Sequence, residues 1–168
     1  DAASYDWSAD FDPPAANGYG GGGEPIPVYV YPYRAAGGLF GTLDDVARFA
    51  AAGMKELTAV EEKVLQPETI KSMYTPEIGM SSYYRFVFEG YGLGHFVEYL
   101  PGENTRENGT RAVSHGGQGS GWMTDFHSVP ATGDGIVILS NSQRTWPGFA
   151  YILTDWAKWL GYASTGMS

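Results

Sequence analysis

The chain has 168 residues, of which 43% are hydrophobic and 15% aromatic. This composition fits one packed globular unit and excludes a largely disordered chain. The net charge of -9 disfavours nucleic-acid binding. The absence of cysteine excludes disulfides and thiolate metal sites. No apolar run approaches the roughly 20 residues of a transmembrane helix, so we expect no membrane span and no nucleic-acid partner.

The N-terminal residues 1–36 are typical of an extended loop. They contain Pro13 and Pro14, the glycine run Gly20–Gly23, and alternating prolines over Pro25–Pro32. Because proline lacks the N–H that a central strand needs, we expect at most an edge strand near Val28–Tyr31. A loop of this length usually lies across another surface or near a site. Residues 37–168 are expected to form the folded domain.

Two helices are predicted next in the chain. Thr42 is a good N-cap and Asp45, three residues later, completes a capping box. The residues that recur at helical spacing after this cap predict a buried face; they are Leu43, Val46, Phe49, Ala50, Met54 and Leu57. The second helix begins at Pro67 and ends before Thr75 and Pro76.

The remaining chain favours strands followed by one helix. Strands are predicted over 84–88, 92–99, 111–115, 121–129 and 135–140, and Asn108–Gly109 is a strong hairpin signal. The last helix, 146–162, places Phe149, Ile152, Leu153, Trp156 and Leu160 on one face, with Gly161 as its stop. The predicted fold class is therefore α+β, with helices packed on an antiparallel sheet.

A histidine followed by glycines is the most informative stretch, Val113–Trp122. It is either a glycine-rich bend between strands or a place where a ligand approaches peptide groups closely. The spacing does not match the G-x-G-x-x-G or G-x-S-x-G motifs, and a strand rather than a helix follows it. His95, His115 and His127 share no metal-ligand spacing, and packing or surface roles are expected for His95 and His127. We therefore predict no metal and no cofactor.

Four segments, taken together and in order, resemble one family. They are Tyr33–Phe49 (YRAAGGLFGTLDDVARF), Tyr91–Gly94 (YGLG), His115–Gly117 (HGG) and Gly135–Asn141 (GIVILSN). They resemble the serine β-lactamase-related hydrolases, which include class C β-lactamases, D-alanyl-D-alanine carboxypeptidases and β-lactamase-like esterases. His115–Gly117 is similar to the histidine form of that family's third motif, otherwise Lys-Thr-Gly. The resemblance implies the C-terminal part of a β-lactamase/penicillin-binding-protein-like (DD-peptidase) fold.

The resemblance also implies acyl transfer through a serine ester, on an amide, a β-lactam or an ester. His115 would line the cleft, the N–H of Gln118 would be an oxyanion donor, and Gly116 and Gly117 would let the substrate lie against the strand. The chain contains no Ser-x-x-Lys and no Tyr-x-Asn, which in the family supply the nucleophile, the base and a proton relay. We therefore expect this chain to be inactive by itself.

The expected partners follow from the same implication. They are a small-molecule or peptide substrate and an N-terminal piece of the same enzyme, or self-association of this chain. The alternative is a non-catalytic domain of the same fold that binds a peptide or glycan or serves as a scaffold; a carbohydrate-binding domain is a weaker option, based only on the 12 tyrosines and 5 tryptophans. An extracytoplasmic location is favoured, since exported bacterial proteins often lack cysteine, as do many cytosolic ones.

Overall fold

The computed structural model describes residues 3–11, 14–54, 65–79, 88–100 and 110–162. Its centre is a six-stranded antiparallel sheet in which strands adjacent in sequence are also neighbours in space. A separate pair of two-residue strands lies in the N-terminal segment. The elements in order are β1 (Gly18–Tyr19), β2 (Pro25–Ile26), α1 (Arg34–Gly37), α2 (Leu43–Ala52), α3 (Pro67–Met73), β3 (Ile78–Gly79), β4 (Phe88–Tyr91), β5 (Phe96–Leu100), β6 (Thr110–Gly119), β7 (Trp122–Val129), β8 (Asp134–Ser140) and α4 (Trp146–Trp159).

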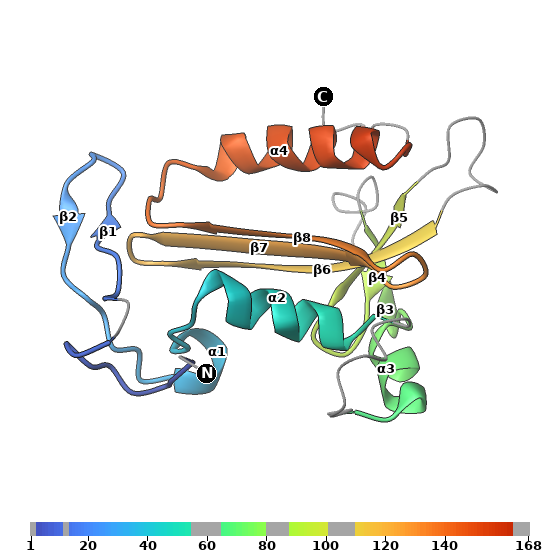
Figure 1. Ribbon diagram of the computed structural model, residues 1–168, viewed down its shortest axis with the longest axis horizontal. Coiled ribbons are helices and arrows are strands. Elements are labelled where there is room, and N and C mark those ends of the chain that lie inside the picture. Colours follow the sequence, from blue (N-terminus) through green and yellow to red (C-terminus); the bar gives the residue numbers. More distant parts are fainter. Residues whose placement is uncertain (1–2, 12–13, 55–64, 80–87, 101–109, 163–168) are drawn as a thin grey trace.

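Helices cover the two faces of the sheet, with α2 on one side and α4 on the other (Figure 1). On the α2 face, the ring of Phe126 packs edge-on against Phe49 at 6.0 Å between centroids. On the α4 face, His127 lies 6.4 Å from the ring of Trp156. Because successive residues of a strand point to opposite faces, these two contacts assign every other residue of β7 to a face. The predicted α+β architecture, with helices on an antiparallel sheet, is confirmed.

A buried apolar cluster lies on the α4 face. It consists of Leu100, Ala112 and Val129, with Trp156 and Tyr162 packed against it. The helix α4 contributes its own buried stripe of Phe149, Leu153 and Ala157. Pro147 occupies its first turn, and Gly161 follows its end with φ of 83°, a conformation that glycine adopts without a Cβ clash.

The predicted buried face of α2 is only partly correct. The capping box is present, because the Thr42 hydroxyl accepts from the N–H of Asp45 at 3.2 Å and the Asp45 carboxylate accepts from the N–H of Thr42 at 3.0 Å. Yet Leu43 is 51% exposed and Phe49 60% exposed, and only Ala50 is buried.

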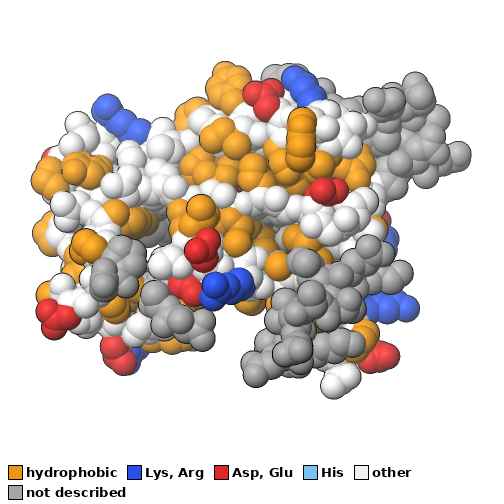
Figure 2. Space-filling view, viewed as in Figure 1, with side chains coloured by type: hydrophobic (Ala, Val, Ile, Leu, Met, Phe, Trp, Pro, Cys, Tyr) orange, Lys and Arg blue, Asp and Glu red, His pale blue; other side chains and the backbone are white. Residues whose placement is uncertain are grey.

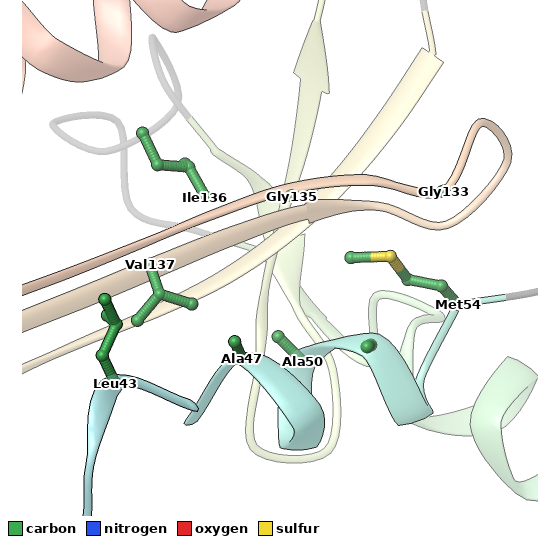
Figure 3. A pocket seen from close by; sticks show the side chains of 9 residues that line it. Leu43, Ala47, Ala50, Met54, Gly133, Gly135, Ile136 and Val137 are labelled. Atoms are coloured by element: carbon green, nitrogen blue, oxygen red, sulfur yellow. The ribbon is translucent and has the colours of Figure 1, made fainter. Parts of the chain in front are cut away.

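Small side chains explain this difference. Alanines on the side of α2 that faces β8 line a groove of about 320 Å³, shown in Figure 3. Larger side chains of the helix therefore lie at its margins. The groove is lined by Leu43, Ala47, Ala50, Ala51, Met54, Gly133, Gly135, Ile136 and Val137.

Glycines move two of the predicted strand boundaries. Gly92–His95 is a turn rather than the start of a strand, since the N–H of Gly92 donates to the carbonyl of His95 at 2.8 Å and Gly94 has φ of 78°. Conversely, Gly116–Gly119 lies within β6, and the bend falls at Ser120–Gly121, where Gly121 has φ of 80°. The glycine-rich stretch is therefore a strand.

The remaining predictions concern the N-terminal strand, residues outside the described ranges and the absence of a membrane span. The N-terminal strand pairing occurs at Pro25–Ile26 with Gly18–Tyr19 instead of at Val28–Tyr31. The predictions for Leu57, for most of 84–88 and for the Asn108–Gly109 hairpin lie outside the described residues. Within the described part of the chain, no helix has the length and apolar character needed to cross a membrane.

The N-cap of α2 gives a stability prediction. Replacing Thr42 by Ala removes the side-chain oxygen that accepts from the N–H of Asp45, so the free energy of unfolding should fall by about 1 kcal/mol. Thr69→Ala, at an exposed position inside α3, is the matched control and should change it by less than about 0.5 kcal/mol. Urea denaturation followed by circular dichroism measures both; equal effects would show that the cap contributes nothing.

Candidate functional site

Strand β6 changes its neighbour along its length, from β5 at its start to β7 at its end, and pairs with both only at Val113 and Ser114. It pairs with β5 from Thr110 to Ser114 and with β7 from Val113 to Gly119. The stretch His115–Gly119, which we call the open edge, therefore has only β7 beside it among the described strands. An open edge presents unpaired N–H and C=O groups that a ligand can pair with.

The register shows which peptide groups point outward. Gly119 and Trp122 face each other across the Ser120–Gly121 turn, and in a two-residue hairpin such flanking residues form a hydrogen-bonded pair. Since hydrogen-bonded and non-hydrogen-bonded pairs alternate, Gly117 is also bonded to β7, whereas Gly116 and Gln118 direct their N–H and C=O groups away from it. Gln118, itself exposed, thus offers its N–H at the open edge.

His115 lies at the inner end of the open edge with its side chain exposed. Its Nδ1 is 2.7 Å from the carbonyl oxygen of Gly116, and its Nε2 is 3.1 Å from the hydroxyl of Tyr91. A carbonyl oxygen only accepts, so Nδ1 carries the proton and, in the neutral ring, Nε2 accepts from the tyrosine. The structure therefore joins His115 to Tyr91 from β4.

Side chains are missing from one face of the open edge. His115, Gly117 and Gly119 share the α2 face by alternation, and two of these three carry no side chain. A Cβ at Gly117 would lie 2.9 Å from the Thr124 hydroxyl oxygen, and one at Gly119 would lie 2.8 Å from the hydroxyl oxygen of Tyr31. We call this surface, from His115 to Gly119, the bare strip.

Gly116 differs from the glycines of the bare strip. It faces the α4 side, and a Cβ there would lie at an ordinary 3.5 Å from a carboxylate oxygen of Asp125. Among the predicted site residues, the structure thus places Gly117 on the same face as His115, whereas Gly116 and Gln118 contribute outward-pointing peptide groups.

A buried polar network lies directly behind the open edge, on the α4 face. His127 Nδ1 is 3.2 Å from a carboxylate oxygen of Glu98, and its Nε2 is 3.4 Å from one of Asp125. The hydroxyl of Ser114 donates to the carboxylate of Glu98. All four side chains are buried, so the network ties β5, β6 and β7 together where the open edge begins.

The charge on His127 follows from its surroundings. Burial lowers the pKa of His127, but the negative charges and hydrogen bonds of Glu98 and Asp125 outweigh it and raise that pKa to about 10. The sequence interpretation, a packing or surface role, missed this network. The two-residue spacing of Asp125 and His127 in a predicted strand was the available signal, since it places both on one face.

His95 has the packing role expected for it. Its ring is buried and lies edge-on to Tyr74 and Phe126, at 5.0 and 5.9 Å between centroids. Its Nδ1 donates to the carbonyl of Leu93 at 3.1 Å, and burial lowers the pKa of His95. No group of three or more potential metal ligands occurs within the described ranges.

Comparisons with known proteins agree on one family and fold. The family model described as Beta-lactamase matches residues 1–156. A human (Homo sapiens) protein called beta-lactamase-like 1 is 27% identical over 141 residues, covering 83% of this chain. Two solved structures share the fold: the octameric penicillin-binding protein homologue from Pyrococcus abyssi, with a TM-score of 0.71, 20% identity and 99% of this chain covered, and SurE, with a TM-score of 0.63, 21% identity and 88% covered.

The chain is short relative to these proteins. It spans 26% of the human protein, 35% of the Pyrococcus abyssi chain and 33% of the SurE chain.

The buried network gives a pH prediction. The pKa of histidine is about 6.5 in an unfolded chain and about 10 for His127 in the fold. Protonated His127 therefore stabilises the fold fully below about pH 6.5, and this contribution is lost as the pH rises through about 10. We expect the free energy of unfolding, measured by urea denaturation between about pH 6 and 10, to fall more steeply in the wild type than in His127→Gln. Equal slopes in the two proteins would contradict the assignment.

Proposed function

The chain belongs to the beta-lactamase family, and we propose that it forms one wall of the active site of a serine hydrolase acting by acyl transfer on an amide, a β-lactam or an ester. The observation that carries the proposal is the open edge His115–Gly119, which begins at an exposed histidine bonded to Tyr91. Such an edge can hold the backbone of an acyl donor by strand pairing, with the carbonyl group of the acyl donor facing the reacting atoms.

Each group of the open edge has a part in this proposal. The serine of a Ser-x-x-Lys segment, absent from these 168 residues, attacks the substrate carbonyl carbon, and its proton passes to the lysine of that segment and the tyrosine of a Tyr-x-Asn segment. The bond from the carbonyl carbon to the amine or alcohol then breaks, and this leaving group takes up the proton. The negative charge that forms on the carbonyl oxygen accepts a hydrogen bond from the outward N–H of Gln118. His115 hydrogen-bonds the substrate through Nε2, in exchange for Tyr91. Gly116 and Gly117 leave the backbone accessible to the acyl group.

We also propose that this chain is covered by a further part of the same protein or by a second copy. Strand β8 pairs only with β7 among the described strands, so its other edge is available for pairing. The outer side of α4 exposes Tyr151 (75%) and Trp159 (80%). Hydrophobic side chains gather on this side of the molecule (Figure 2), as expected for a contact surface. The octameric state of the Pyrococcus abyssi homologue is consistent with self-association.

The alternative is a binding domain without catalysis. The same outward groups of Gly116 and Gln118 support a peptide ligand, because strand pairing requires a regular series of N–H and C=O groups that a glycan does not have. The alternative and the hydrolase differ in one observable: only the hydrolase forms a covalent acyl intermediate.

Turnover by the isolated chain tests the assignment of the nucleophile. The pure 168-residue chain should hydrolyse neither a chromogenic ester nor a chromogenic cephalosporin, and mass spectrometry should detect no acyl adduct. A longer polypeptide that joins Ser-x-x-Lys and Tyr-x-Asn segments to this chain should hydrolyse one of them and form an adduct. Turnover by the pure chain would refute the proposal, and a longer polypeptide that binds substrate without an adduct would favour the binding domain.

The oxyanion donor is tested by a matched pair at Gln118 in the longer polypeptide. Gln118→Pro removes the outward N–H from an edge position, where proline is tolerated, so kcat/KM should fall about 100- to 1000-fold. Gln118→Ala keeps the N–H and should retain nearly all activity. Equal kcat/KM values for the two variants would exclude this N–H as the donor.

A further inference from the structure

The bare strip ends at a group of aromatic side chains from a distant part of the sequence. Its length, from His115 to Gly119, is about 14 Å at the usual rise of an antiparallel strand. At the far end, the hydroxyl of Tyr31 accepts from the N–H of Ser120 at 2.6 Å. The space of a Gly119 side chain is taken by the same hydroxyl. The N-terminal segment is therefore attached to the site at this point.

Tyr31 is the middle member of a row of three tyrosines, which we call the tyrosine ladder. Its ring centroid lies 5.9 Å from that of Tyr29 and 5.2 Å from that of Tyr33. The two outer rings are 58% and 59% exposed. Pro27 precedes this row and Pro32 lies within it; each proline fixes its own φ at about -65° and biases the residue before it towards extended backbone.

Contact between a row of aromatic rings and water is energetically unfavourable, so an exposed row suggests a binding role. Neighbouring Val28 and Val30 are also exposed, at 40% and 58%, so the segment exposes apolar side chains at successive positions. Exposed apolar patches mark binding surfaces, and tyrosine offers a large contact area with little loss of side-chain entropy.

We propose that the tyrosine ladder is a binding subsite for an aromatic or large apolar side chain of an extended peptide ligand. The peptide backbone pairs with the outward groups of Gly116 and Gln118, and a side chain several residues from His115 packs on Tyr29 and Tyr33. This proposal rests on the peptide occupying the open edge, as in the proposed function, but requires no catalysis. Since backbone pairing is the same for any peptide, the ladder supplies the selectivity.

Peptide binding to the 168-residue chain tests this subsite. The probes are three fluorescein-labelled pentapeptides: all-alanine, phenylalanine at the first position, and phenylalanine at the last. Fluorescence anisotropy should show about tenfold tighter binding for one of the phenylalanine peptides than for the all-alanine peptide. In the double variant Tyr29→Ala/Tyr33→Ala this preference should disappear, while the affinity for the all-alanine peptide stays unchanged.

Tyr151→Ala is the control, because this tyrosine is also exposed (75%) but lies on α4; the preference should persist there. Equal binding of all three peptides by the wild type, no binding at all, or a preference that survives in the double variant would overturn the proposal. Binding of a β-linked oligosaccharide that is lost in the double variant, without a peptide preference, would assign the ladder to glycans and also overturn it. A phenylalanine preference without hydrolysis by the longer polypeptide would leave the subsite intact and refute only the hydrolase.

Discussion

Strand β6 loses its neighbour β5 after Ser114, and this loss creates the open edge around which the site is arranged. Strand β5 begins only at Phe96, because the turn Gly92–His95 precedes it. Beyond that point only β7 lies beside β6 among the described strands, so Gly116 and Gln118 direct their peptide groups away from the sheet; the Gly116 carbonyl also accepts from Nδ1 of His115. The exposed His115 and the bare strip lie along this open edge, and the tyrosine ladder lies at its far end.

The buried network explains how an open edge can be held in place. Removing charges from water is costly, and a buried ion pair rarely adds net stability. Here Glu98 on β5 contacts His127 on β7, which also contacts Asp125, and Ser114 adds β6 at the last residue that it shares with β5. The network therefore fixes the strand register at the boundary of the site, where a shift by one residue would turn His115 and the glycines to the wrong face.

Local chemistry determined which features were predictable. The Thr42 cap, the start of α3 at Pro67 and the stop at Gly161 depend on neighbours in sequence, and all three were correct. The exposure of Leu43 and Phe49 depends on how closely the alanines of α2 approach β8. Helical periodicity in the sequence does not give this distance. Likewise, the glycines after His115 predict a bend equally well as a strand, and only pairing with β7 decides between them. The position of the tyrosine ladder beside the site could not be predicted, because it depends on a contact between Tyr31 and Ser120, which are 89 positions apart.

Amide hydrogen exchange along β6, measured by NMR on the 168-residue chain, tests directly whether this strand has an open edge. If His115–Gly119 is an open edge, the N–H groups of Gly116 and Gln118 exchange rapidly, whereas those of Gly117 and Gly119, bonded to β7, are protected. This alternation is the predicted result. Protection of all four N–H groups would mean that another segment already covers the edge, and rapid exchange of all four would mean that the glycine stretch is not a strand; either outcome would contradict an open edge at His115–Gly119.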